Sequence, residues 1–141
     1  MSCIFCRIAE GSVPAHIVWQ DDLIVAFLDS HPIRPGHLQI IPREHHAYFT
    51  DLPADTAARI IHVGQRLAKA AKALNDVPRV AFLFTGGDIP HAHAHVVPMH
   101  KGTDITSRRY IANAEVTFCS TDAATAEELA HVASLLRNSI A

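Results

Sequence analysis

Short apolar runs, rich in β-branched and aromatic residues and bounded by polar or turn-forming residues, divide the first part of the chain. Runs of this composition are typical of β-strands. They predict strands at residues 17–20, 23–28, 37–41 and 80–85, with Asp21-Asp22 as a hairpin turn between the first two. Residues 91–98 predict a fifth strand, and the turn at residues 86–88 before it favours antiparallel pairing with the fourth.

A different spacing of apolar residues marks two helices. Between Pro53 and Asn75 they recur every three or four positions, which predicts one long amphipathic helix with Pro53 in its first turn. The same spacing from Leu129 to Ile140 predicts a final helix with Asp122 as its N-cap.

The remaining segments are short. Residues 2–11 predict a brief helical stretch, with Ser2 as N-cap and Gly11 in the left-handed conformation after its end. Residues 115–120 predict a weak strand. The 141 residues therefore predict a single α+β domain (residues 1–141), in which an antiparallel sheet of about five strands carries a long helix on one face and a second helix at the end.

Three histidines, His91, His93 and His95, alternate with alanines in the predicted fifth strand. Successive side chains of a strand point to opposite faces, so we expect the three imidazoles on one face and the alanines packed closely against the other. Aligned imidazoles suit catalysis, because one neutral imidazole can act as a nucleophile while a neighbour orients it or donates a proton. Two alternatives stay open, since this spacing also suits zinc or copper, or a polar strand face without function.

Composition narrows the range of partners. The 12 Lys and Arg against 14 Asp and Glu give a formal net charge of −2, without the basic excess that is typical of nucleic-acid-binding proteins. No apolar run reaches the roughly 20 residues of a membrane span, and the start of the sequence lacks a secretory signal pattern. We therefore expect a cytoplasmic protein that binds a small anionic ligand and neither nucleic acid nor membrane. The 3 cysteines form no disulfide framework, which favours reduced thiols or a metal site.

Four motifs occur in a recognisable order. They are Cys3-Ile4-Phe5-Cys6, Ala26-Phe27-Leu28-Asp29, Pro35-Gly36-His37 before an apolar strand, and His91-x-His93-x-His95. In this order and approximate spacing they resemble the histidine triad (HIT) family of nucleotide hydrolases and transferases, from Cys3 to about Pro98. The resemblance implies a HIT-like fold and an enzyme, a nucleoside phosphoramidase or dinucleoside polyphosphate hydrolase.

The resemblance also implies roles for individual residues. His93 is the expected nucleophile that attacks the α-phosphorus and forms a covalent nucleotidyl-histidine. His95 would contact the phosphate and the departing group, while His91 and His37 would orient the imidazole cluster. Asp29 would accept hydrogen bonds from the ribose hydroxyls, although an Asp at a strand end also commonly serves a turn. The base would enter an apolar pocket formed by Ile4, Phe5, Ile8 and Phe27, which are equally good core residues.

The segment just before the triad departs from the family pattern. Many relatives have Gly-Gln-Ser or Gly-Gln-Thr there, with side chains and amides that assist phosphate binding, whereas this chain has Gly86-Gly87-Asp88 followed by Ile89. We keep Gly87, Asp88 and Ile89 as candidate nucleotide-binding residues. Because the Asp88 carboxylate would repel a phosphate, we expect it to turn away or to pair with a cation. The departure leaves open a second function, a weak or inactive nucleotide- or metal-binding module on the same fold.

Cys3 and Cys6 have the separation of a zinc knuckle, which requires two further ligands. Some bacterial relatives complete such a site with histidines that correspond to His45 and His91. The resemblance thus implies a structural zinc ion that fixes the segment bearing the nucleophile, while the alternative is two reduced cysteines in a helical turn.

The resemblance also implies a homodimer. Its interface would use the second half of the helix at residues 53–75 and the strand at residues 80–85, whose apolar residues on both faces permit burial on both sides.

Overall fold

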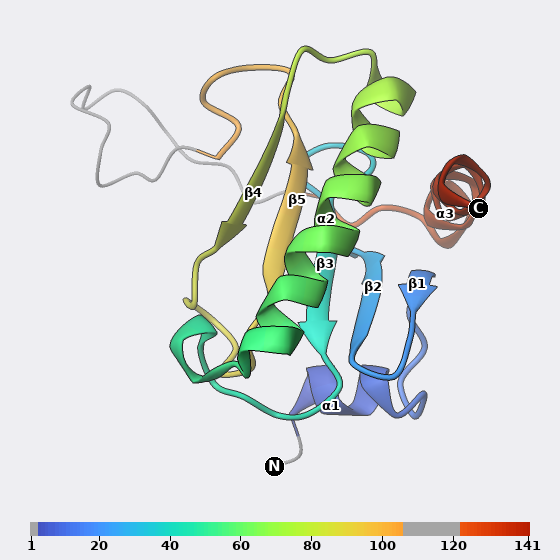
Figure 1. Cartoon of the computed structure of the whole chain (residues 1–141). Coiled ribbons are helices and arrows are strands. Elements are labelled where there is room, and N and C mark those ends of the chain that lie inside the picture. The colour runs from blue at the N-terminus through green and yellow to red at the C-terminus, as the bar shows by residue number, and fades with distance from the viewer. Residues whose placement is uncertain (1–2, 106–121) are drawn as a thin grey trace, which may run out of the picture.

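The computed structural model describes residues 3–105 and 122–141. The predicted strand at residues 115–120 and the Ser2 cap lie outside this part of the chain. The centre of the described structure is an antiparallel sheet of five strands in the order β1-β2-β3-β5-β4 (Figure 1). The strands are β1 (Ile17–Gln20), β2 (Ile24–Leu28), β3 (Leu38–Pro42), β4 (Val80–Phe84) and β5 (Ala94–Pro98). The predicted α+β class and antiparallel sheet are confirmed.

Two helices cover one face of the sheet, and a third, short helix lies on the other. The long helix α2 (Ala54–Asn75) crosses the sheet, and α3 (Ala126–Ile140) packs beside it near β1 (Figure 1). Together they bury the main hydrophobic core against the sheet. On the opposite face, α1 (Ile4–Ala9) packs its Phe5 and Ile8 against strands β2 and β3, and a 3-10 turn, η1 (Phe49–Asp51), precedes α2.

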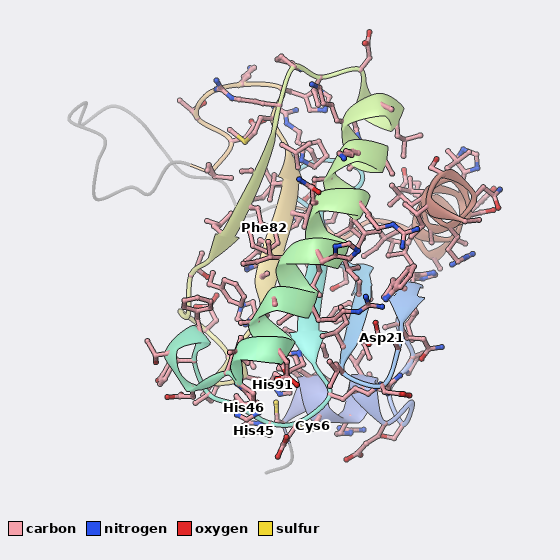
Figure 2. The ribbon with its side chains drawn as sticks, viewed as in Figure 1. Cys6, Asp21, His45, His46, Phe82 and His91 are labelled. Atoms are coloured by element: carbon pink, nitrogen blue, oxygen red, sulfur yellow. The ribbon has the colours of Figure 1, made fainter. Side chains whose placement is uncertain are left out.

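Close packing between α2 and the sheet depends on small residues. The Phe82 ring of β4 lies so close to Gly64 of α2 that a Cβ at this position would overlap it (Figure 2). Ala94 of β5 is fully buried against the same helix. This agrees with the predicted close packing for Ala94, whereas Ala92 is buried but lies before the strand and outside this core cluster.

The triad begins before strand β5 and not within it. The prediction of a strand over residues 91–98 was wrong at this end, because β5 starts at Ala94. The neighbouring strand β3 ends at Pro42, which has no N–H to extend the ladder. The Ala92 N–H instead donates to the His46 carbonyl at 2.6 Å. His91 and His93 therefore lie in an irregular segment that leads into the strand.

The helix starts also differ from the prediction. Thr125, and not Asp122, caps α3, because the Thr125 side chain accepts from the Glu128 N–H while the Glu128 carboxylate accepts from the Thr125 N–H. Pro53 is the N-cap of α2 and not part of its first turn. Gly11 has φ +81°, as predicted for the residue after α1. Within the described residues, no helix is both long enough and apolar enough to cross a membrane.

Candidate active site and metal centre

A row of side chains crosses the sheet on the face opposite α2. Residues that pair across antiparallel strands lie next to each other on one face. The register places in this row, from β1 to β4, Ile17, Phe27, Gln39, His95 and Leu83. The Phe27 ring and the His95 imidazole thus lie on either side of Gln39.

His93 is buried, with 6% of its surface exposed, and its ring has a fixed orientation. Its Nδ1 lies 2.7 Å from the His91 carbonyl oxygen, which can only accept, so Nδ1 carries the proton. The Nε2 atom is left with a free lone pair. The Phe5 ring packs edge-on against the imidazole, with 5.1 Å between ring centroids. This is the tautomer that a nucleophilic histidine requires.

His37 and His95 form a directed hydrogen-bond chain. The Ile33 N–H donates to His37 Nδ1 at 3.1 Å, so the proton of a neutral His37 is on Nε2. His37 Nε2 lies 2.9 Å from His95 Nδ1, which therefore accepts, and His95 carries its own proton on Nε2. The backbone N–H of Ile33, in the loop at residues 29–37, thus fixes the tautomers of both rings, so that His95 presents an N–H donor at Nε2.

Burial keeps both imidazoles of this chain neutral. It lowers the pKa of His37, although the Asp29 carboxylate acts in the opposite direction. Burial and the neighbouring charge of a protonated His37 lower the pKa of His95 to about 4. At neutral pH the Nε2 atom of His95 is therefore a neutral hydrogen-bond donor.

Asp29 lies at the end of β2, beside this chain. Its Oδ1 accepts from the His31 N–H at 2.8 Å, and its Oδ2 accepts from the Gln39 side-chain amide at 2.6 Å. The same Oδ2 lies 3.6 Å from His37 Nε2. The carboxylate is thus held at the boundary between the imidazoles and the adjoining cavity.

This cavity has a volume of about 500 Å³. It is apolar along most of its wall and polar at Asp29, and it includes the five apolar residues proposed for nucleotide binding, Ile4, Phe5, Ile8, Phe27 and Ile89. Two parts of the wall were not predicted. One is the loop after α1, with Val13 and His16, and the other is the start of α3, with Ala126 and Leu129.

Gly87 and Asp88 lie at the exposed end of the loop between β4 and β5. A Cβ at Gly87 would meet no atom within 4 Å. The Asp88 carboxylate is close enough to His95 to oppose, weakly, the fall in the pKa of that imidazole. The structure thus places these two residues at the rim and not among the buried groups.

Cys3, Cys6, His45 and His91 come together at the end of the sheet beside α1, and Figure 2 shows three of them there. Their ligand atoms all lie within 4.8 Å of one another. His91 Nδ1 is 3.4 Å from the Cys3 sulfur and 3.5 Å from the Cys6 sulfur, which in turn is 3.3 Å from His45 Nδ1. Zinc bound to sulfur at about 2.3 Å and to nitrogen at about 2.0 Å gives ligand–ligand edges of about 3.5 Å. The donor set and its spacing fit a tetrahedral metal ion.

The buried His91 ring is oriented for this role. Its Nε2 donates to the Pro42 carbonyl at 2.9 Å, which leaves the Nδ1 lone pair directed at the two cysteine sulfurs. Burial lowers the pKa of His91, so the ring is neutral, as a metal ligand must be. The ring of His91 thus belongs to the metal cluster, while its carbonyl fixes the His93 tautomer.

Asp29, His37 and His95 also bring three potential ligand atoms within 4.8 Å of one another. Their hydrogen bonds argue against a metal there. A metal at His37 Nε2 would force the proton onto Nδ1, which already accepts from the Ile33 N–H. We therefore interpret this group as a hydrogen-bond chain.

Reasoning from the sequence missed Gln39, which holds Asp29. The available signal was a single amide in an otherwise apolar strand, at a position that faces the site. It also missed the start of α3, because no motif marks a helix as the wall of a cavity formed by residues a hundred positions earlier.

Comparison with known proteins agrees with this geometry. The family model of the HIT domain matches residues 10–102. A HIT-like protein of Methanocaldococcus jannaschii is 32% identical over 108 residues, which cover 71% of this chain and 81% of the relative. The adenosine 5′-monophosphoramidase of Schizosaccharomyces pombe is 34% identical over 103 residues, covering 70% and 74%.

The structural likeness extends further along the chain. The crystal structure of a zinc-bound histidine triad family protein from Mycobacterium smegmatis superposes with a TM-score of 0.76 at 29% identity, covering 99% of this chain and 94% of the other. The motifs, the oriented imidazoles and these matches lead to one conclusion, that this chain belongs to the histidine triad family.

Proposed function

We propose that the protein cleaves the bond between the α-phosphorus and the leaving group of a nucleoside phosphoramidate or dinucleoside polyphosphate, through a covalent intermediate on His93. The observation that carries this proposal is the free Nε2 lone pair of His93 beside the oriented N–H of His95. The His91 carbonyl holds the His93 proton on Nδ1 and so leaves this lone pair free. The phosphoramidase name of the S. pombe relative supports the reaction class.

The reaction would proceed in two steps. His93 Nε2 attacks the α-phosphorus, the new N–P bond replaces the bond to the leaving group, and the departing nitrogen or oxygen takes up the proton that His95 Nε2 presents. A bound phosphate raises the pKa of His95, because negative charge favours the protonated imidazole, so His95 enters the first step as an imidazolium, gives up its Nε2 proton and becomes neutral. Water then attacks the phosphorus, His95 takes up its proton, and the N–P bond breaks to release the nucleoside monophosphate and neutral His93.

The nucleotide would lie with its base in the apolar cavity and its ribose at Asp29. This order follows the row across the sheet, from Phe27 through Gln39 to His95. Two carboxylate oxygens with free lone pairs can accept from both ribose hydroxyls, and the adjoining apolar wall suits a flat base.

A binding module without catalysis is the alternative, favoured by the exposed Gly87 and Asp88 where relatives present an amide and a hydroxyl. Turnover of adenosine 5′-phosphoramidate separates the two functions. We expect the wild-type protein to release adenosine monophosphate and ammonia, and rapid acid quench to trap nucleotide bound to protein. Binding of adenosine monophosphate without turnover would select the module.

We also propose that zinc binds at Cys3, Cys6, His45 and His91. The fit rests on two sulfurs and two imidazole nitrogens at tetrahedral spacing, with the His91 lone pair directed at the sulfurs. A closed set of four protein ligands makes the ion structural, since it leaves no position for water or substrate. These residues would clamp the start of the chain onto the segment that carries His93.

Finally, we propose a homodimer that uses the second half of α2 and strand β4. β4 is an edge strand, so one side of its backbone lacks a strand partner within the described sheet. Phe82 of β4 and Leu74 of α2 are 38% and 37% exposed, so these two elements, which contact each other, carry apolar surface that an interface would bury. Sedimentation at micromolar concentration should give about twice the mass of 15.4 kDa, and a monomer over that range would refute this proposal.

A further inference from the structure

We infer that Gln39 is a positioning residue, which holds the Asp29 carboxylate in the orientation that accepts the ribose hydroxyls and keeps it away from the His37–His95 chain. The inference rests on the proposed function, because it takes Asp29 as the ribose acceptor. Gln39 belongs to none of the four motifs of the family resemblance.

Gln39 has a central position in the row of side chains across the sheet. Its register partners are Phe27 on β2 and His95 on β5, so it lies between the apolar cavity and the imidazole that faces the leaving group. A nucleotide that spans these two groups passes its ribose over Gln39. Side chains at directly paired positions are about 5 Å apart at Cβ, which leaves no room for an intervening residue.

Gln39 contacts the Asp29 carboxylate directly. The Gln39 amide donates to Asp29 Oδ2 at 2.6 Å, a short bond to a carboxylate that is itself held by the His31 N–H through Oδ1. Bonds of this kind to charged groups are stronger than those between neutral groups. With both oxygens held, the carboxylate keeps one rotamer.

Without the Gln39 amide, the Asp29 carboxylate could turn toward His37. Asp29 Oδ2 is already 3.6 Å from His37 Nε2, whose proton is donated to His95. A carboxylate free to turn would attract that proton, and His95 Nδ1 would lose its donor. Gln39 therefore separates the group that binds ribose from the group that serves the chemistry.

One polar atom of the Gln39 side chain does not stabilise the folded state. Its Oε1 is buried and has no hydrogen-bond partner among the described residues. Turning the amide over would satisfy nothing, because Oε1 would then face the Asp29 carboxylate. Buried polar atoms without partners cost free energy, so the contact of the Gln39 amide with Asp29 explains this residue better than packing within the strand does.

The inference predicts a larger effect on binding than on stability for Gln39→Leu. Leucine removes the unpaired oxygen, which favours the folded state, and also the bond to Asp29, which disfavours it, so the melting temperature should change little. Binding of adenosine monophosphate, measured by titration calorimetry, should weaken about tenfold, as expected for the loss of well-placed hydrogen bonds. The KM for adenosine 5′-phosphoramidate should rise by a similar factor, with a smaller change in kcat. Gln65→Leu makes the same chemical change on the exposed face of α2 and should change neither constant.

A ligand without ribose hydroxyls identifies the contact. Wild-type protein should bind 2′,3′-dideoxyadenosine monophosphate more weakly than adenosine monophosphate, whereas Gln39→Leu should bind both with nearly equal affinity. A general distortion of the site would weaken both ligands equally and would overturn the inference, as would unchanged affinity for adenosine monophosphate.

A second variant introduces a pH dependence. In Gln39→Glu the new carboxyl group faces Asp29, and only its protonated form can donate as the amide does. The affinity of Gln39→Glu for adenosine monophosphate, divided by that of the wild-type protein at the same pH, should therefore be low at pH 8 and recover toward pH 5, while the same ratio for Gln65→Glu should stay constant. An equal ratio for Gln39→Glu at both pH values would contradict the inference. If wild-type protein binds no adenosine monophosphate at all, the proposed function itself has failed, and the inference falls with it.

Discussion

Two clusters among the described residues could hold a metal, and their composition alone does not tell them apart. One combines Cys3, Cys6, His45 and His91, and the other combines Asp29, His37 and His95. The difference lies on the far side of each imidazole ring. His91 donates from Nε2 to a carbonyl, so a lone pair faces its cluster, whereas His37 accepts at Nδ1 from a backbone N–H, so a proton faces its cluster.

This contrast shows how a backbone atom assigns the function of a histidine. A carbonyl behind the ring leaves a lone pair on the other nitrogen, as at His91 and His93, which suits a metal ligand or a nucleophile, and an N–H behind the ring leaves a donor, as at His37. Substitutions in the two clusters should therefore have different effects on chemistry, metal content and stability.

The largest effect should come from His93→Ala. Removing the nucleophile should abolish covalent nucleotidylation and lower turnover by at least about three orders of magnitude. Metal content should stay unchanged, because His93 contributes no ligand atom to the metal cluster. Acid-quench trapping and metal analysis measure both, and a folded variant with near-normal turnover would disprove the assignment.

The next effect concerns the metal cluster. Protein purified without chelators should carry about one zinc ion per chain, and Cys3→Ser combined with Cys6→Ser should lose it together with several kcal/mol of unfolding free energy. Asp29→Asn and His37→Asn should retain the metal in full. Metal content near zero in the wild-type protein would leave the two cysteines as plain reduced thiols.

A smaller effect is expected from His37→Asn, which removes the donor to His95 Nδ1. Without it the His95 ring can adopt the other tautomer, and we expect kcat to fall about 10- to 100-fold with little change in nucleotide affinity. Steady-state kinetics and calorimetric titration separate the two quantities. Loss of affinity with unchanged kcat would mean that His37 contacts substrate and not His95.

The smallest effect is a pH dependence of stability. The pKa of His95 is lowered from 6.5 to about 4 in the folded protein, so between these values the unfolded chain binds the proton and the folded chain does not. The stability contributed by neutral His95 is complete above about pH 6.5 and is lost as the pH falls toward 4. His95→Gln should therefore show a smaller drop in melting temperature between pH 7 and pH 4.5 than the wild-type protein, and identical drops would contradict this explanation.

The sequence predicted most of the fold because its signals are local. The apolar runs predicted the bounds of all five strands to within one or two residues, apart from the start of β5, and the helical spacing predicted α2 and α3. The start of β5 was wrong because it depends on Pro42, a residue of the neighbouring strand. The α3 cap was wrong because Asp122 and Thr125 are both good N-caps, and only Thr125 has a glutamate three residues later.

The site was predicted as far as motifs identify residues. Cys3, Cys6, His45 and His91 come together as the resemblance implied, and so do Asp29, His37 and His95. What the sequence could not supply were the partners that orient these groups, namely the Ile33 N–H, the Pro42 carbonyl and the Gln39 amide. Two of these are backbone atoms, which carry no signal in the residue type.

The start of α3 has a consequence for how this protein can change. The HIT domain match ends at residue 102, yet Ala126 and Leu129 of α3 line the cavity beside Phe5 and Phe27. In the proposed binding mode the base lies in this cavity, so substitutions at Ala126 and Leu129 would reshape the space for the base without altering any histidine of the triad. Preference for one nucleoside over another can therefore evolve, or be engineered, at the end of the chain while the chemistry at its centre stays the same.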